Sequence, residues 1–451
     1  MGIKTSFFCK TCGTQHSKWQ GQCNSCKEWN TLVEEIIEKR KEENWDLKSS
    51  HTKTNKSIQL QKINVDDESR ILTSDNELNR VLGGGIVAGS VILLGGEPGV
   101  GKSTLLLQIA INLKLRTLYV SGEESQKQIK LRATRMGLCN DNSYVLNETR
   151  IKNVFREISN LNPELVIIDS IQTLQSDVID NTVGSVSQIK QTTTELIQFA
   201  KESNIPVFLV GHITKDGQIA GPKVLEHMVD TVLNFEGDRN HVYRILRAQK
   251  NRFGATDEIG IYKMISKGIN AVSNPSELLL NQNENGLSGQ AVGVTVEGVR
   301  PLLLEIQALV SSAVYGTPQR SSTGFNAKRL NMLLAVLEKR AGFNLGIKDV
   351  FINFTGGISV NDTALDLAVV ASILSSYYEV SINKNICFAA EIGLSGELRP
   401  VSKINLRIKE AAKLGFKCIL ISKFNKIDLN KVKIEIKYIE KIEDIISILF
   451  K

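Results

Sequence analysis

Residues 96–104, GEPGVGKST, have the spacing G-x-x-x-x-G-K-[ST] of a loop that binds phosphate groups. They follow an apolar run, SVILLGG, and lead into STLLLQIAINL, so the motif has the preceding strand and the following helix that it requires. Gly96, Gly99 and Gly101 let backbone N–H groups curl round a phosphate, and the helix N-terminus adds its positive dipole end. A glycine loop without a ligand is the alternative, which is disfavoured because strand, helix, lysine and serine occur together.

The loop predicts a site for ATP and Mg²⁺. Lys102 can reach the terminal phosphates, and the Ser103 hydroxyl can hold the magnesium ion. Asp169 ends the apolar run LVIIDS, where a carboxylate can bind the water shell of the same ion. The predicted nucleotide-binding residues are Gly96, Glu97, Pro98, Gly99, Val100, Gly101, Lys102, Ser103, Thr104 and Asp169.

Hydrolysis also needs a group that activates or orients a water molecule beside the γ-phosphate. Glu123 and Glu124 follow the apolar run TLYVSG and should reach the same edge of the sheet. Glu123 lies nearer to its strand and is predicted to be the catalytic carboxylate, with Glu124 as the alternative. His212 ends the run PVFLVGH, where it is either a sensor of the γ-phosphate or a structural histidine.

The seven cysteines fall into two groups. Cys9, Cys12, Cys23 and Cys26 form C-x2-C-x10-C-x2-C, a spacing that can place four thiolates tetrahedrally around one zinc ion. So small a segment could not fold on apolar burial alone, and a structural zinc ribbon is therefore predicted. Unrelated thiols or a redox pair are the alternative, which the doubled C-x2-C spacing disfavours. The remaining cysteines are predicted to be buried small hydrophobic residues: Cys139, Cys387 and Cys418.

All three tryptophans, Trp19, Trp29 and Trp45, lie in or near this ribbon. Packing around its small core is the role that we predict for them. An exposed face that contacts a partner or stacks on bases is the alternative.

The composition is that of a globular protein with more than one domain. The chain has 451 residues, of which 42% are apolar and 23% charged, and a prior of about 150 residues per domain suggests two or three domains. No apolar stretch approaches the about 20 residues that span a bilayer, and the N-terminus has neither an apolar signal core nor an Arg-rich presequence. We therefore expect a cytoplasmic protein without a membrane anchor. The formal net charge of +7 fits a polyanionic partner without requiring one.

Short apolar runs must position these residues. SVILLGG, TLYVSG, ELVIIDS and PVFLVGH alternate with helical patterns, which predicts an α/β domain with a parallel sheet that is covered on both faces. Before them, the polar stretch EEIIEKRKEENWDLKSSHTKTNKS predicts a linker over residues 34–60 with a helical start.

The order of these motifs resembles the RadA (Sms) family of bacterial recombination and repair proteins. The resemblance covers nearly the whole chain: the four-cysteine ribbon, GEPGVGKST, the stretch KDGQIAGPKVLEHMVD, the KNRFG motif that is diagnostic of the family, and a last third similar to the protease domain of Lon. It implies a zinc finger over 1–33, the linker, a RecA-like P-loop ATPase core over 61–274 and an α+β Lon-protease-like domain over 275–451. It also implies a homo-hexameric ring motor that hydrolyses ATP, binds single-stranded and branched DNA, promotes branch migration and works with a recombinase filament of RecA type.

The KNRFG motif, residues 250–254, offers two cations to such a ring. A RecA-type site lies open at the sheet edge, so a cation from the adjacent subunit can meet the charge that develops on the γ-phosphate. The motif ends an expected antiparallel hairpin, TVLNFEGDRNHVYRIL, that would direct it away from its own phosphate loop. Lys250 and Arg252 are therefore predicted to act in trans, beside Lys102 and Glu123. Binding of DNA phosphates by the same two cations is the alternative.

Two loops are predicted to face DNA in the pore of the ring. One is SDVIDNTVGSVSQIK, residues 176–190, and the other is TKDGQIAGPKVLEH, residues 214–227, which carries Lys215 and Lys223. Neither loop has interleaved aromatic residues, so we expect salt-sensitive backbone contacts without sequence preference. Ordinary solvated loops are the alternative.

The Lon-like region lacks the groups that a Lon protease needs, a serine nucleophile and an activating lysine. Ala364 aligns with the serine in ISVNDTALDLAVVASIL, and Asn405 aligns with the lysine in GELRPVSKINLRIKEAA. An inactive scaffold for oligomerisation is predicted. A shifted alignment is the alternative and would use nearby groups: Ser359, Lys403 and Lys409. A basic face for duplex DNA is predicted from Arg399, Lys403, Arg407 and Lys409.

Three functions remain in order of preference. A DNA-stimulated motor ATPase leads. An ATP-dependent serine protease of Lon type is the first alternative, and a nucleotide-switched DNA-binding platform without motor activity is the second.

Overall fold

The computed structural model describes residues 4–9, 14–37, 59, 70–137, 139–211, 224–237, 243–272, 276, 286–313, 317–355, 360–428 and 432–450. The chain divides into two compact units, Met1–Val272 and Ser273–Lys451. The sequence placed this boundary between residues 274 and 275.

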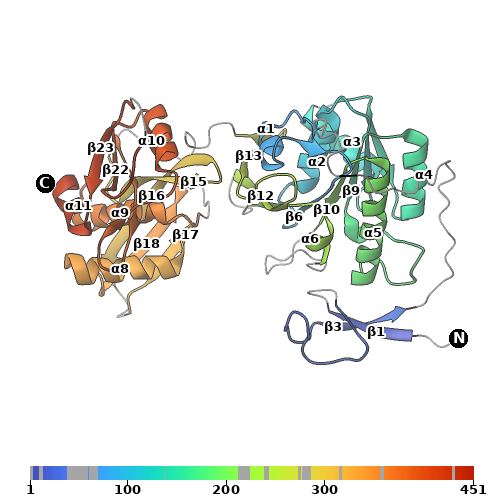
Figure 1. Cartoon of the computed structure of the whole chain (residues 1–451), viewed down its shortest axis with the longest axis horizontal. Coiled ribbons are helices and arrows are strands. Elements are labelled where there is room, and N and C mark those ends of the chain that lie inside the picture. The colour runs from blue at the N-terminus through green and yellow to red at the C-terminus, as the bar shows by residue number, and fades with distance from the viewer. Residues whose placement is uncertain are drawn as a thin grey trace. The chain divides into compact units, whose positions relative to one another are not determined.

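The N-terminal ribbon is a small antiparallel sheet (Figure 1). Its strands β1 (Lys4–Cys9), β2 (Gln15–His16) and β3 (Leu32–Ile37) take the order β2-β1-β3. The helical start that we predicted from residue 34 is wrong, because β3 runs to Ile37 and pairs with β1 along its whole length. The β-branched residues of LVEEII, one valine and two isoleucines, favour a strand, and this preference outweighs the helix propensity of the two glutamates.

The rest of the first unit contains a sheet of nine strands in the order β14-β13-β12-β11-β6-β10-β9-β7-β8. The strands from β11 to β8 are parallel to their neighbours, and β12, β13 and β14 extend the sheet with antiparallel pairs. Their bounds are β6 (Val91–Gly96), β7 (Thr117–Ser121), β8 (Ser143–Asn147), β9 (Leu165–Asp169), β10 (Val207–Val210), β11 (Thr231–Glu236), β12 (Tyr243–Asn251), β13 (Ile259–Ile265) and β14 (Gly268–Ala271). A separate short pair joins β4 (Arg70–Ile71) to β5 (Ile86–Val87).

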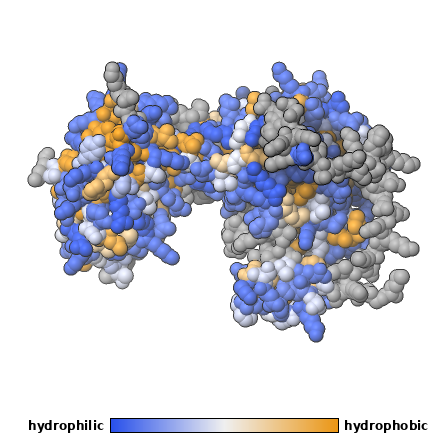
Figure 2. Space-filling view, in the orientation of Figure 1, coloured by the Kyte–Doolittle hydropathy of each residue, from blue (hydrophilic) through white to orange (hydrophobic). Residues whose placement is uncertain are grey.

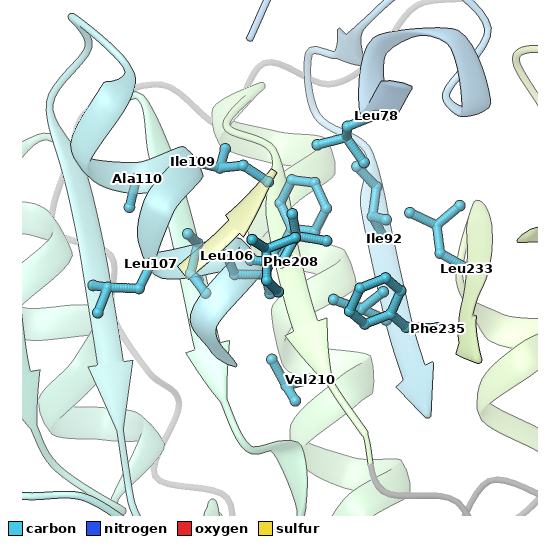
Figure 3. Close-up of a cluster of buried hydrophobic side chains, with 14 of the residues drawn as sticks. Leu78, Ile92, Leu106, Leu107, Ile109, Ala110, Phe208, Val210, Leu233 and Phe235 are labelled. Carbon is cyan, nitrogen blue, oxygen red and sulfur yellow. The ribbon is translucent and has the colours of Figure 1, made fainter. Parts of the chain in front are cut away.

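Helices cover both faces of this sheet because its central strands are apolar on both faces. Ile92 and Leu94 of β6 belong to the core under α1 (Asn76–Val81), α2 (Lys102–Asn112) and α3 (Gln126–Met136), part of which Figure 3 shows. Val91 and Leu93 alternate with them and belong to the core under α4 (Ile151–Leu161), α5 (Val186–Ser203) and α6 (Val224–Met228). A short turn of 3-10 helix, Ile171–Thr173, follows β9. The α/β fold that the apolar runs predicted is confirmed.

The C-terminal unit is a mixed sheet with helices on both faces. The sheet order is β17-β18-β16-β15-β19-β22-β23, and Gly293 of β15 faces α9 while its neighbour Val294 packs in the core with α10. The strands are β15 (Gln290–Glu297), β16 (Arg300–Ser312), β17 (Arg320–Thr323), β18 (Lys348–Phe354), β19 (Ile386–Ala389), β22 (Cys418–Ser422) and β23 (Glu435–Ile439), with β20 (Glu391–Ile392) and β21 (Leu398–Arg399) as a separate hairpin. The helices are α8 (Ala327–Ala341), α9 (Asp366–Tyr378), α10 (Ile404–Lys413) and α11 (Ile442–Leu449), and a 3-10 turn, Thr363–Leu365, precedes α9.

The surface that Figure 2 shows is largely hydrophilic on both units, with hydrophobic residues gathered on part of the C-terminal unit. Within the described ranges, no helix is long and apolar enough to cross a membrane.

Candidate active site

The phosphate loop joins β6 to α2 at the carboxyl edge of the parallel strands. Gly99 and Gly101 have φ angles of 82° and 114°, which glycine adopts without strain. At Gly101 a side chain would also meet the Ile269 Cδ1 atom at 2.9 Å. Because Gly101 is the N-cap of α2 and has no side chain to bond the first N–H groups, those groups stay free for an anion.

Lys102 begins α2 and is only 4% exposed. Its Nζ atom donates to the Gly96 carbonyl at 2.6 Å and to the Glu97 carbonyl at 3.0 Å, so the ammonium binds the back of its own loop. Burial lowers the pKa of the Lys102 side chain to about 8, although nearby carboxylates, Asp169 first among them, oppose the shift. When ATP binds, a negatively charged phosphate oxygen would take the place of these two carbonyls as the partner of the Lys102 ammonium.

The lowered pKa predicts that ATP affinity falls as the pH rises through about 8. Only the protonated Lys102 pairs with phosphate, so binding should weaken by about tenfold between pH 7 and pH 9. Titration with a fluorescent ATP analogue from pH 7 to pH 9.5 measures this dependence. An affinity that stays constant over that range would show that Lys102 remains fully protonated there.

Asp169 ends β9 at the same edge of the sheet and is 5% exposed. Tyr119 of β7 donates its hydroxyl proton to the Asp169 Oδ2 atom at 2.5 Å. This bond fixes the carboxylate and leaves its other oxygen, Oδ1, for the water shell of a magnesium ion. Sequence reasoning missed Tyr119, although a tyrosine inside an aliphatic buried strand needs a partner for its hydroxyl group.

The two glutamates after β7 have different surroundings. Ser170, next to Asp169, donates its hydroxyl proton to the Glu123 Oε1 atom at 2.5 Å. Glu124 instead forms an ion pair with Arg132 of α3. The structure therefore brings Glu123, and not Glu124, beside Asp169, which supports Glu123 as the carboxylate that acts on water.

Several predicted residues lie outside the described ranges. They are His212, Lys215 and Lys223, together with Trp45, Cys12 of the ribbon and Ser359 of the C-terminal unit. The other predicted DNA loop, residues 176–190, is described. Its end, residues 186–190, is not loop but the start of α5, and the preceding residues close over the buried Gln188 side chain of that helix. The Gln188 Nε2 atom donates to the carbonyls of Ser176, Ile179 and Asn181, at 2.9 to 3.2 Å.

Lys250 and Arg252 lie at the sheet edge opposite to their own phosphate loop. Lys250 pairs with Val232 inside β12, so it belongs to the strand and does not lie beyond its end as the sequence suggested. The Arg252 N–H group donates to the Asp230 carbonyl, and the Asp230 N–H group donates to the carbonyl of Val91, the first residue of β6. Gly96 is five residues farther along β6, which is about 17 Å in a strand.

Both cations contact other residues of the same chain in this structure. The Lys250 Nζ atom donates to three carbonyls at the C-terminal end of α6, those of Glu226, His227 and Val229, at 2.7 to 3.0 Å. Burial, and after it the charge of Arg252, lowers the pKa of Lys250. The Arg252 side chain is 55% exposed and pairs with Asp230 at 3.2 Å.

The ribbon places three of the four predicted cysteines together. The Sγ atoms of Cys9, Cys23 and Cys26 lie within 4.8 Å of one another, and those of Cys9 and Cys26 are 3.6 Å apart. Two thiolates on one zinc ion would be about 3.8 Å apart, so the donor set fits zinc.

His16 adds a contact to this cluster that the cysteine spacing did not predict. The Gln20 amide donates to His16 Nδ1 at 2.8 Å, which leaves His16 Nε2 to donate to Cys23 Sγ at 3.4 Å. Such a bond from a neighbouring group is typical of metal thiolates.

Three further expectations for cysteines and tryptophans turn out differently. Trp19 and Trp29 are 58% and 68% exposed, so packing around the ribbon core is wrong for both. Cys139 is exposed, because it follows the end of α3, whereas Cys387 and Cys418 are buried as predicted.

In the C-terminal unit, Ala364 is fully buried in the turn before α9, and the Asn405 side chain accepts the N–H group of Asp428 at 3.2 Å. Arg407 does not belong to a basic face: it is 1% exposed and pairs with Asp362 at 2.7 Å. Burial opposes ionisation of Asp362, but Arg407 holds the pKa of that carboxyl below its usual value.

The other cations of the predicted basic face remain at the surface. Arg399 pairs with Glu397 at 2.7 Å, and the Lys403 Nζ atom donates to the Gly298 carbonyl. Lys409 is exposed.

A phosphate loop on the central strand, a buried carboxylate two strands away and helices on both faces define a P-loop ATPase of the RecA-like class. Family models match in three places: AAA domain at residues 54–218, rubredoxin metal binding domain at 7–34, and subunit ChlI of Mg-chelatase at 307–425. The DNA repair protein RadA of Bacillus subtilis (strain 168) is 48% identical over 94% of this chain and 93% of its own length. RadA of Listeria monocytogenes is 48% identical over 93% of this chain and 92% of its own. The chain belongs to the family of the DNA repair protein RadA.

Among solved structures, a KaiC-like protein from Pyrococcus horikoshii OT3 aligns with 46% of this chain and all of its own chain. The TM-score is 0.38 and the sequence identity 16%.

Proposed function

We propose that this chain is a DNA-stimulated ATPase that works as a homo-hexameric ring on single-stranded and branched DNA. It promotes branch migration of recombination intermediates, beside a recombinase filament of RecA type. The family membership and the ATPase fold support the repair function and the hydrolysis of ATP. The ring and its action on DNA are the further steps of the proposal.

The observation that carries the ring is the position of Arg252. A cation is needed where charge develops on the γ-phosphate, and Arg252 lies at the level of Val91, about 17 Å along β6 from Gly96. It cannot reach its own nucleotide from there. Its exposed side chain is therefore free to turn from Asp230 toward the nucleotide of a neighbouring copy.

Within one subunit, each group has a separate task. Lys102 exchanges its two loop carbonyls for the terminal phosphates when ATP binds. Ser103 and Asp169 would hold a magnesium ion, which would supply charge neutralisation at the phosphates, and Glu123 orients the attacking water. Tyr119 keeps Asp169 in place through the hydroxyl bond.

Lys250 links this machinery to DNA. Its ammonium caps α6, which contains the last four residues, 224–227, of the predicted DNA loop over 214–227. A loop that moves on binding DNA would thus move the strand that carries Arg252. The loop over residues 176–190 supplies a second contact of the pore with the DNA backbone.

The ribbon and the C-terminal unit complete the proposal. Zn²⁺ is the metal that we assign to Cys9, Cys12, Cys23 and Cys26, because a set of thiolates at this spacing selects it. The C-terminal unit is a Lon-like scaffold of the ring and not a peptidase, since Ala364 and Asn405 supply neither nucleophile nor base.

The test is ATP turnover with and without single-stranded DNA, followed by branch extension on a joint molecule of three strands. We expect severalfold stimulation and extension that needs hydrolysable ATP, with a Lys102→Ala chain as the inactive control. ATP turnover that is the same with and without DNA would contradict the proposal. Stimulation without extension would leave the nucleotide-switched platform as the function.

A further inference from the structure

A buried arginine contacts the phosphate loop from outside the motif. Arg244 is the second residue of β12, lies opposite Tyr262 of β13 and is 6% exposed. Its Nε–H group donates to the Val100 carbonyl at 3.3 Å, across 144 residues of sequence. The Nη1 group donates to the carbonyl of Tyr243 at 2.9 Å, which holds the guanidinium in one orientation.

The chain leaves space for this side chain. A Cβ atom at Gly237, just after β11, would lie 2.2 Å from Arg244 Cδ, so a larger residue would displace the arginine. The position of the Arg244 side chain beside the phosphate loop therefore depends on glycine at position 237.

The contact with Val100 determines where the next N–H group points. The peptide unit between Val100 and Gly101 is planar and trans, so its C=O and N–H bonds point in opposite directions. With the carbonyl turned toward Arg244, the Gly101 N–H group is directed to the other side of the loop. That side is where phosphate-binding loops receive the anion.

Strand β12 runs from the edge of the sheet that carries the phosphate loop to the opposite edge. β12 pairs with β11 on one side and with β13 on the other, so it is held along its length. Arg244 lies near its start, and Lys250 is six residues farther on, about 20 Å in a strand. One strand therefore runs from the phosphate loop of its own subunit to the cations proposed to act on the neighbouring nucleotide.

We propose that Arg244 is a positioning residue that holds the phosphate loop in its binding conformation and couples it, through β12, to Lys250 and Arg252. ATP bound in one subunit then sets the position of the cations that complete the next site. The coupling rests on the ring and the trans role proposed above, whereas the effect on the loop does not.

The test uses full-length chains with Arg244→Met, Arg244→Lys and Arg247→Met. Methionine keeps the apolar stem and removes the donors, whereas lysine keeps a donor and a charge. Arg247 is the matched control, because it is an arginine on the same strand whose guanidinium pairs with the Glu236 side chain at 3.1 Å. Thermal melting without nucleotide checks that all three variants fold.

The first measurement is equilibrium binding of a fluorescent, non-hydrolysable ATP analogue. We expect about tenfold weaker binding for Arg244→Met, the loss of a charge-assisted hydrogen bond, partial recovery for Arg244→Lys, and no change for Arg247→Met. Binding by Arg244→Met at the wild-type level would overturn the positioning role. This measurement needs no ring, DNA or hydrolysis, so the failure of the proposed function cannot cause it to fail.

The second measurement is the Hill coefficient of ATP hydrolysis against ATP concentration. We expect a value above 1 for the wild type and for Arg247→Met, and a value of 1 for Arg244→Met at concentrations that saturate it. A Hill coefficient that Arg244→Met leaves unchanged would overturn the coupling through β12. Whether the ring forms a shared site is tested separately, by mixing Arg252→Ala and Lys102→Ala subunits.

Discussion

Glu123→Gln is expected to lower kcat for ATP hydrolysis by about 10²–10⁴-fold, the usual contribution of a group that acts as general base. ATP affinity should stay within about threefold, because the amide keeps the size of the side chain and Lys102 still binds the phosphates. The structural reason is the bond from Ser170 to Glu123, which places this carboxylate beside Asp169. Single-turnover hydrolysis and equilibrium binding separate the two effects.

Glu124→Gln is the matched control, since it changes the same chemical group one residue away. Its carboxylate pairs with Arg132, so the variant loses an ion pair at the end of α3 but no group at the nucleotide. We expect kcat within about threefold of the wild type. A loss with Glu124→Gln as large as that with Glu123→Gln would show that the ion pair, and not Glu123 alone, sets the catalytic geometry.

The parts of the fold that the sequence predicted are those whose pattern is local. The phosphate loop has its strand, glycines, lysine and helix within about 20 consecutive residues, so all its determinants are visible together. The apolar runs gave the parallel sheet for the same reason, since Ile92 and Val91 show alternation on two buried faces.

The parts that it did not predict depend on partners far away in the chain. Arg407 shares the buried face of α10 with Ile404 and Ile408, but its charge predicted an exposed side chain. Only the position of Asp362 explains how a charged residue can be buried there. In the sequence, Arg244 cannot be distinguished from the other cations of its hairpin. Only the fold shows that it contacts Val100. Neither contact leaves a periodic signal in the sequence, because each joins two elements that the topology brings together.

Lys250 and Arg252 lie between these two cases. Their types and their hairpin predicted two cations remote from their own phosphate loop, and the register of β12 supports that distance. The sequence could not separate their tasks, because the carbonyls that hold Lys250 belong to α6 and the carboxylate that holds Arg252 belongs to Asp230. The difference in environment suggests that Arg252 is the cation that acts on the neighbouring nucleotide.

Mixing Arg252→Ala subunits with Lys102→Ala subunits is expected to restore ATP hydrolysis that neither variant has alone. An Arg252→Ala subunit keeps an intact phosphate loop, and a Lys102→Ala neighbour keeps an intact Arg252. In an equal mixture, about one interface in four unites the two intact halves, so turnover should reach about a quarter of the wild-type value if interfaces act independently. Turnover per subunit as a function of the mixing ratio measures the rescue.

Mixing Lys102→Ala with Glu123→Gln is the control that gives this result its meaning. Both changes lie in the half of the site that the phosphate loop carries, so no interface regains a complete site and turnover should stay at the level of the parents. Rescue in this control would mean that mixed rings regain activity by a route other than pairing an intact phosphate loop with an intact Arg252. Absence of rescue in the Arg252 mixture would instead assign that cation to the DNA backbone. The loss caused by Arg252→Ala would then be a loss of DNA affinity that is largest at low salt and shrinks as the salt concentration rises.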